Sequence, residues 1–252
     1  MKRIFNGISY HSGGGRLLTA VLACLLLLAS APAASAKPGD KLLNRPYADM
    51  KRMHLGFSVG MHLQDLNFTH NGFLTPDGQR WVAEVPGFSP GFCVNVLADL
   101  RLHKHFNLRF SPGMYFGNKT VHMRESGSGL TWTQDIKSAY VVLPVDLKLS
   151  GNRYINSRPY VTVGGMGTFD VSKRRSEPIW LNTTDFYLTL GIGCDFYLPF
   201  FKFNPEVKFC FGLSDILKHD RPDLVDDYET MKITNSLAKA KSNMIVFTFY
   251  FE

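Results

Sequence analysis

The stretch DFYLTLGIGCDFY, residues 185–197, decides the fold class. Its even-numbered positions from Phe186 to Phe196 are all apolar, whereas its odd-numbered positions are aspartate, tyrosine, threonine or glycine. Successive side chains of a β-strand point to opposite faces of a sheet, so this alternation predicts a strand with one apolar and one polar face.

The same alternation recurs along the chain at intervals typical of an antiparallel sheet. Five further segments show it clearly: 54–64, 106–116, 139–149, 201–212 and 245–252. Two segments with a weaker pattern, 88–100 and 159–169, bring the expected number of strands to eight. A soluble antiparallel sandwich also alternates in this way, so alternation alone leaves that class open.

Charged side chains occupy only one of the two faces in the six clearly alternating segments. They include Arg109, Asp146, Lys148, Asp195, Lys202, Glu206 and Lys208. An apolar face without charge and an opposite face that collects charge indicate a barrel with lipid outside and a polar lumen. Because an interior of eight strands is just wide enough for side chains, we expect these seven residues to form a paired network.

Connection lengths favour the membrane barrel over the sandwich. Short connections at 101–105, 150–158 and 198–200 alternate with longer ones at 69–87, 117–138, 170–184 and 213–243. Short periplasmic turns and longer extracellular loops are typical of bacterial outer-membrane barrels. The sequence therefore predicts an all-β, eight-stranded antiparallel up-and-down transmembrane β-barrel with both chain ends in the periplasm.

The first 36 residues indicate export. Lys2, Arg3 and Arg16 precede an apolar run over 17–29, and Ala34-Ser-Ala36 provides a small-residue cleavage site. The run is shorter than the roughly 20 residues of a membrane-spanning helix, which favours a cleaved signal peptide of the Sec type. We expect a signal peptide over 1–36, a periplasmic arm over 37–52 and an outer-membrane barrel over 53–252.

Composition argues against several other classes. The formal net charge is +7, but the basic residues are scattered apart from Lys173, Arg174 and Arg175, so no nucleic-acid partner is predicted. Cys93, Cys194 and Cys210 are an odd and widely spaced set, which predicts neither a disulfide framework nor a zinc site. No catalytic, cofactor-binding or metal-binding residues are predicted, and no cofactor.

Three stretches together resemble the PorT family. They are YVVLPVDLKL at 140–149, PYVTVGG at 159–165 and NPEVKFCFGLSD at 204–215. The resemblance implies an outer-membrane barrel of the type IX secretion and gliding apparatus, needed for export of proteases and adhesins to the cell surface. It also implies that other secretion-system subunits are its partners, through binding or assembly.

Two other functions remain as alternatives. His54, Ser58 and His62 share the polar face with Glu206, and a lipid-modifying barrel enzyme would use such a hydroxyl and base. A structural or adhesive surface barrel is the other alternative. In every case the outer-membrane lipid is a partner, and Lys173, Arg174 and Arg175 are candidate loop contacts to lipopolysaccharide phosphates.

Overall fold

The computed structural model describes residues 43–70, 81–84, 89–125, 131–172, 182–217 and 237–252. The chain separates into two units, Met1–Lys41 and Leu42–Glu252, and the second of these is the folded unit described below. The predicted signal peptide lies outside the described residues. Among the residues described, no helix is long and apolar enough to cross a membrane.

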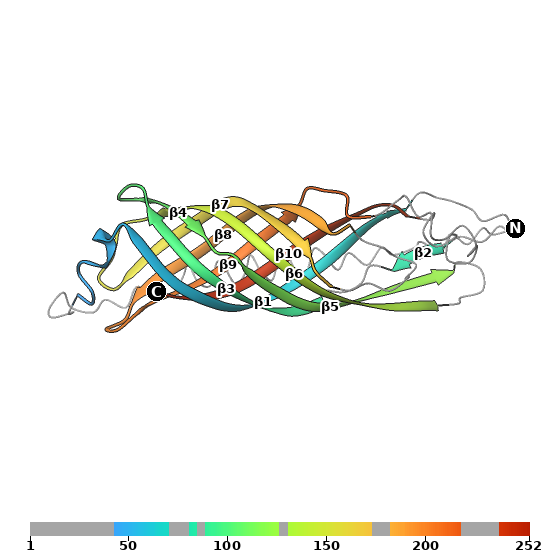
Figure 1. The fold of residues 1–252 in the computed structure, drawn as a ribbon, viewed down its shortest axis with the longest axis horizontal. Helices are drawn as coiled ribbons and strands as arrows, with labels where there is room; N and C mark the ends of the chain where they lie inside the picture. Colours follow the sequence, from blue (N-terminus) through green and yellow to red (C-terminus); the bar gives the residue numbers. More distant parts are fainter. Residues whose placement is uncertain (1–42, 71–80, 85–88, 126–130, 173–181, 218–236) are drawn as a thin grey trace, which may run out of the picture. The chain divides into compact units, whose positions relative to one another are not determined.

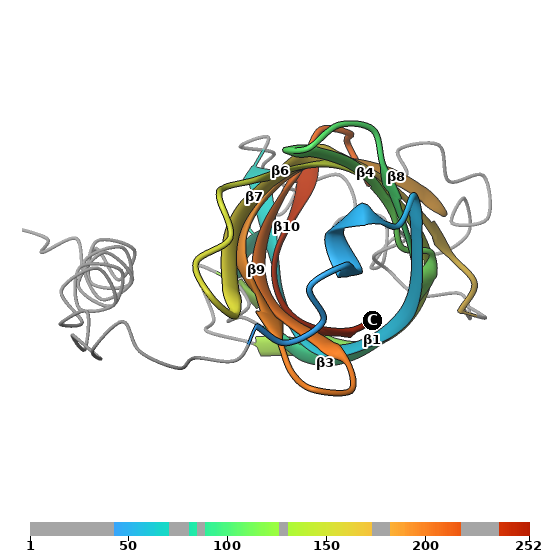
Figure 2. The ribbon, with the colours of Figure 1, turned by 90° about the vertical axis from the view of Figure 1, so that its left-hand side faces the viewer.

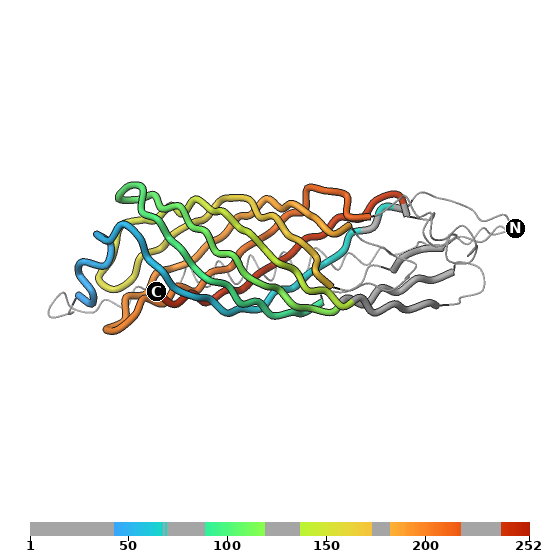
Figure 3. Tube along the Cα trace, viewed as in Figure 1, coloured from blue at the N-terminus to red at the C-terminus, as the bar shows by residue number. Residues whose placement is uncertain are grey.

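Ten antiparallel strands follow a single turn of 3-10 helix, η1 (Ala48–Met50). Figure 1 labels the strands, and Figure 3 shows the course of the chain in the same view. The strands are β1 (Met53–His70), β2 (Trp81–Glu84), β3 (Ser89–Arg101), β4 (Phe106–Phe110), β5 (Gly113–Glu125), β6 (Thr131–Ser150), β7 (Ser157–Asp170), β8 (Thr184–Tyr197), β9 (Lys202–Gly212) and β10 (Leu237–Phe251).

The sheet closes on itself because β1 pairs with both β3 and β10. Strands β4 and β5 lie end to end between β3 and β6, and the short β2 pairs only with β5, so the closed ring has eight strand positions. Figure 2 shows this ring seen along the barrel. The predicted eight-stranded up-and-down barrel is confirmed.

The predicted strand 106–116 is interrupted where Pro112 stands. Proline has no N–H to donate to the ladder. The neighbouring groups still pair across the break, because the Ser111 N–H donates to the Pro144 carbonyl at 3.4 Å and the Val96 N–H donates to the Pro112 carbonyl at 2.9 Å. The wall therefore continues from β4 into β5 without changing which face looks inward.

Burial follows the predicted alternation. On β8, Leu188, Leu190 and Ile192 are 44%, 44% and 51% exposed, whereas the intervening Thr189 is 1% exposed. Outward phenylalanines gather toward both ends of the barrel, for example in the stacked pairs Phe57–Phe251 and Phe92–Phe116. An apolar outer band with aromatic residues at its edges is the surface that a lipid bilayer requires.

Three predicted connections contain strand: 69–87 includes β2, 213–243 includes the start of β10, and 117–138 differs most. Residues 117–138, expected to form a long loop, are mostly strand, because β5 continues to Glu125 and β6 begins at Thr131. The polar composition of this segment interrupts the apolar alternation. A strand needs only about 9–11 residues to cross the bilayer, and its continuation beyond the hydrocarbon needs no apolar face. The short connections 102–105, 151–156 and 198–201 all lie at the opposite end.

Candidate functional site: the charged lumen and the arm across one mouth

Arg109 lies in the barrel lumen with its side chain fully buried. Its guanidinium contacts Glu206 Oε2 at 2.9 Å through Nη1 and Asp99 Oδ2 at 3.2 Å through Nη2. The rings of Tyr250 and Tyr160 flank it, with their centroids 4.6 and 5.2 Å from Cζ. Strands β3, β4, β7, β9 and β10 thus meet at one cation.

Asp195 holds two lysines on the side of the lumen nearer the short turns. The Lys148 ammonium donates to both of its carboxylate oxygens, at 2.7 and 2.8 Å, and lies 4.1 Å from the centroid of the Tyr160 ring. Lys202 lies 3.4 Å from the same carboxylate and donates to Glu252 Oε2 at 2.8 Å. Two cations therefore share Asp195, and Glu252 neutralises the second of them.

Lys208 joins a third group of charges. Its ammonium contacts Asp146 Oδ2 and lies 3.3 Å from Glu206 Oε1. The Thr189 hydroxyl donates to the other oxygen of Asp146 at 2.6 Å. Glu206 also binds Arg109, and Glu252, which binds Lys202, lies 3.6 Å from Arg109, so all seven charged residues singled out in the sequence lie in one connected lumen cluster.

Two members of this cluster, Asp99 and Glu252, were not among the residues predicted from the sequence to form it. Asp99 is fully buried, accepts a 2.5 Å hydrogen bond from Asn107 and binds Arg109. It lies in the weakly patterned segment 88–100. Asp99 stands at an odd-numbered position like Cys93, Asn95 and Leu97, and this shared face of the strand is the sequence feature that could have identified it as inward. Glu252 follows β10 and continues its inward parity, so the alternation of that strand also indicated it.

The lumen is packed with these side chains rather than open. Glycines on β8 leave the space that some of these side chains occupy. A Cβ added at Gly193 would lie 2.4 Å from the Tyr160 ring, and one added at Gly191 would lie 2.3 Å from Thr162 Oγ1. Burial raises the pKa of a carboxyl, but Lys202, Lys148 and Arg109 outweigh it and lower the pKa of Glu252 to about 2.

The hydroxyl and imidazole groups of the enzyme alternative have other partners. Ser58 Oγ accepts a hydrogen bond from Asn95 Nδ2 at 3.0 Å, and His62 stacks on Tyr115 with ring centroids 5.2 Å apart. His54 Nε2 lies 2.8 Å from the Ala48 carbonyl oxygen. Glu206 binds Arg109 and Lys208, so the structure does not bring these four residues together as a catalytic set.

Several other predicted features can be placed. Cys93, Cys194 and Cys210 are free thiols, two of them buried in the lumen. Within the described ranges, no group of three or more histidine, cysteine, aspartate and glutamate side chains is arranged to hold a metal ion. Lys173, Arg174 and Arg175 lie outside the described residues.

Residues 43–52, which we call the arm, lie across the barrel mouth at the end with the short turns. Figure 2 shows η1 inside the outline of the ring. Asp49 fixes it there, because its carboxylate accepts a hydrogen bond from the Tyr197 hydroxyl and lies 3.5 and 3.7 Å from Arg158 and Arg153. The Arg153 guanidinium also stacks 3.6 Å from the centroid of the Tyr197 ring.

The first residues of the arm are held by backbone contacts. The Asn44 N–H donates to Asn156 Oδ1 at 2.9 Å, and Arg153 donates to the carbonyls of Asn44 and Arg45. Arg45 and Ile155, whose carbonyls both accept hydrogen bonds from Arg153, have φ angles of 48° and 54°. Left-handed backbone is costly for such residues and persists only where surrounding contacts enforce it.

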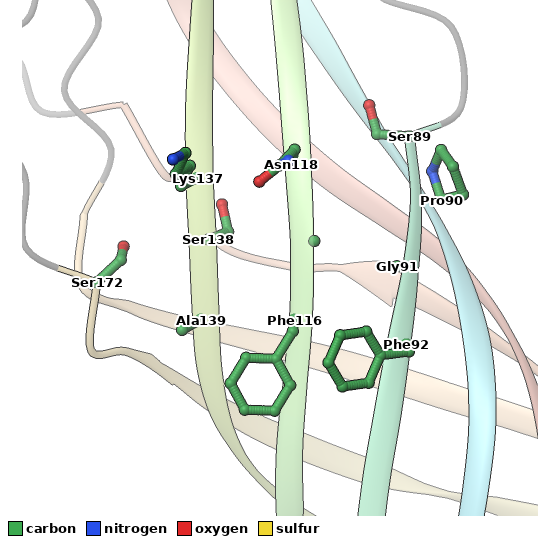
Figure 4. Close-up of a pocket in the computed structure, with 11 residues that line it drawn as sticks. Ser89, Pro90, Gly91, Phe92, Phe116, Asn118, Lys137, Ser138, Ala139 and Ser172 are labelled. Atoms are coloured by element: carbon green, nitrogen blue, oxygen red, sulfur yellow. The ribbon is translucent and has the colours of Figure 1, made fainter.

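A larger hollow of about 700 Å³ lies toward the other end, against the wall formed by β3, β5 and β6. Figure 4 shows its lining, with the stacked rings of Phe92 and Phe116 beside the polar residues Asn118 and Ser138. Ser138 is 5% exposed, and its hydroxyl has no hydrogen-bond partner among the described residues.

An eight-stranded closed barrel with an apolar exterior and a charged, filled lumen defines the class of small outer-membrane β-barrels. The sequence over residues 36–218 matches the family described as the outer membrane protein beta-barrel domain, and the chain belongs to this family. The protein is therefore located in the outer membrane. In barrels of this class the short turns face the periplasm, which places the arm at the periplasmic mouth.

Solved structures with a similar fold are distant relatives in sequence. OprG of Pseudomonas aeruginosa is 12% identical with a TM-score of 0.45, and the match covers 78% of this chain and 93% of OprG. Neisserial surface protein A is 7% identical with a TM-score of 0.40, over 79% and 98% of the two chains. The outer membrane protease OmpT of Escherichia coli is 10% identical with a TM-score of 0.36, over 79% and 95%. No curated protein sequence matches.

Removing Glu206 should destabilise the barrel. Glu206→Ala leaves Arg109 and Lys208 buried with one partner fewer, so we expect the free energy of unfolding to fall by about 3–5 kcal/mol. The measurement is urea unfolding of the refolded barrel, together with the midpoint of its heat-induced gel shift. An exposed substitution, Lys239→Ala, is the control, and a gel shift unchanged by Glu206→Ala contradicts the prediction.

The contribution of Glu252 should depend on pH. Its folded-state pKa is lowered from 4.5 to about 2, so its ionised form stabilises the barrel fully above pH 4.5, and this contribution is lost as pH falls toward 2. Glu252→Gln should cost about 3 kcal/mol at pH 7. Urea midpoints of both proteins between pH 7 and 2 test this. A difference between the two proteins that stays constant across this range argues against it.

Loosening the Asp49 contact should free the arm without opening the barrel. Asp49→Asn removes two ion pairs and weakens the hydrogen bond from Tyr197, so we expect trypsin to cut after Lys51 or Arg52 about tenfold faster. Peptide mapping measures the cleavage, and the heat-induced gel shift should be unchanged. Tyr47→Ser, an exposed residue in the same arm, is the matched control. Equal cleavage of both variants shows that Asp49 does not anchor the arm.

Proposed function

We propose that this barrel is a non-enzymatic component of the type IX protein secretion system in the outer membrane. It acts by binding other subunits or assisting their assembly, and it is needed for export of proteases and adhesins to the cell surface. The secretion role comes from the sequence resemblance to the PorT family. The filled lumen supports the mode of action, because a barrel whose interior is occupied by its own side chains works through the surfaces that it displays.

The observation that carries this proposal is the connected cluster of charges around Arg109, Asp195 and Lys208, whose side chains are buried in the lumen toward the end with the short turns. The arm adds a displayed surface, since Tyr47 and Met50 are 73% and 68% exposed at the periplasmic mouth while Asp49 holds the segment in place. Exposed apolar side chains on a fixed segment are suited to contact with a periplasmic subunit. On the cell surface, Lys173, Arg174 and Arg175 remain proposed contacts to lipopolysaccharide phosphates.

Deletion of the gene tests the proposal. We expect protease and adhesin cargo to accumulate in the periplasm, as measured by fractionation and surface protease activity, and the wild-type gene to restore export. The double variant Tyr47→Ser/Met50→Ser should restore less export than the matched surface variant Lys239→Ser/Lys241→Ser at equal barrel abundance.

The other two candidate functions predict different results in the same strains. Normal cargo at the surface with a changed lipid A mass supports a lipid-modifying enzyme. Normal cargo with altered adhesion supports a structural or adhesive surface barrel. Either result overturns the secretion role.

A further inference from the structure

A small hollow lies where the arm meets β1 and the end of β10. Its volume is about 110 Å³, several times the roughly 30 Å³ of a water molecule, and therefore sufficient for a phosphate-sized group. Arg45, Lys51, His54, Lys202 and Glu252 contribute to its lining. Four of these five side chains are cationic or can become so.

The side-chain carboxylate of Glu252 in this hollow is already paired with other groups. Glu252 accepts hydrogen bonds from Lys202 at 2.8 Å and from Asn204 Nδ2 at 2.6 Å, and it lies 3.6 Å from Arg109. The Arg45 guanidinium makes one hydrogen bond, from Nη1 to the Glu252 backbone carbonyl at 3.1 Å, so most of its five N–H donors remain available. Lys51 has no ion pair within the described part of the chain. The hollow therefore has donors to spare for an anion.

The adjacent rim is basic as well. The Arg101 N–H donates to the Arg52 carbonyl at 2.8 Å, which brings the start of β1 beside the turn between β3 and β4. Arg52 and Lys104 are exposed and Arg101 is half-buried, and none of the three makes a side-chain ion pair with any residue that the structure describes. The nearest carboxylates in sequence, Asp49 and Asp99, are bound to other arginines.

An apolar strip leads from the hollow along the outer face of the barrel. Met53 and Leu55 line the hollow itself and are 55% and 63% exposed, and Phe57 continues the strip at 54%. Leu100, which pairs with Met53 across β1 and β3, is 42% exposed on the same face. A cationic hollow thus opens beside apolar side chains that face the bilayer at the periplasmic boundary.

We propose that this hollow binds the phosphate headgroup of an anionic phospholipid from the periplasmic leaflet, with an acyl chain lying along Met53, Leu55 and Phe57. Arg45 and Lys51 contact the phosphate, and Arg52 and Arg101 add attraction from the rim. Arginine binds phosphate through paired N–H donors, and each cation near an anionic lipid surface adds to its affinity. A soluble anion would use the same donors but would leave the apolar strip unused, so a phospholipid fits both parts of the site.

Native mass spectrometry of the full refolded barrel with dioleoylphosphatidylglycerol tests this site. Lys51→Gln/Arg52→Gln removes two exposed cations whose side chains make no ion pair with any described residue, so the barrel should form normally. Because each cation contributes roughly fivefold, we expect lipid binding about 25-fold weaker. Lys239→Gln/Lys241→Gln, an exposed pair on β10 near the other rim, is the matched control and should bind like the wild type. Equal binding by the hollow variant overturns the proposal.

A second measurement separates a phospholipid from a free anion. Phosphatidylglycerol with a photoactivatable group in its acyl chain should crosslink to residues 53–57, and glycerol phosphate at the same concentration should not displace it. Crosslinks confined to other strands, or full displacement by glycerol phosphate, overturn the lipid assignment. Both readouts use the isolated barrel and require no secretion activity, so their outcome is independent of the proposed secretion role.

Discussion

The pairing of β1 with β10 is the constraint on which the remaining structure depends. In the hydrocarbon region no water satisfies backbone N–H and C=O groups, so a sheet can cross the membrane only when it has no free edge. The register that joins Phe57 to Phe251 and Leu63 to Ile245 provides this closure. It also fixes the inward face of every strand, because a shift by one residue would turn charged side chains toward lipid.

Closure with eight strand positions determines what the lumen can hold. The interior is just wide enough for side chains, so each inward charge meets charges from other strands instead of bulk water. Arg109 illustrates the result, since its partners Asp99 and Glu206 come from β3 and β9. A charge buried in this way is tolerated only when partners compensate it, which explains why the cations and carboxylates of the cluster alternate in space.

A filled lumen shifts the functional interest to the two ends of the barrel. At the periplasmic end the arm is fixed by Asp49 and leaves a basic hollow beside the membrane boundary. Toward the other end a larger hollow lies against β3, β5 and β6, and the Ser138 hydroxyl in its lining has no hydrogen-bond partner among the described residues. The barrel therefore presents different chemistry to the two sides of the membrane.

The sequence by itself determined the class of fold, because a period of two is a local property that Asp185 to Tyr197 displays without reference to the rest of the chain. It also determined which charges face inward wherever that period is clean. It missed the charge of Asp99 within the predicted strand 88–100, and it failed over 117–138, where a polar pattern hid the continuation of β5 and the start of β6. Only the tertiary structure decided which charges meet. It brings Asp49 to Arg153, in the turn between β6 and β7, and it places Lys202 and Glu252 beside Lys51 around one hollow. These contacts join residues far apart in the chain, and the strand register and closure that create them depend on all eight strand positions at once.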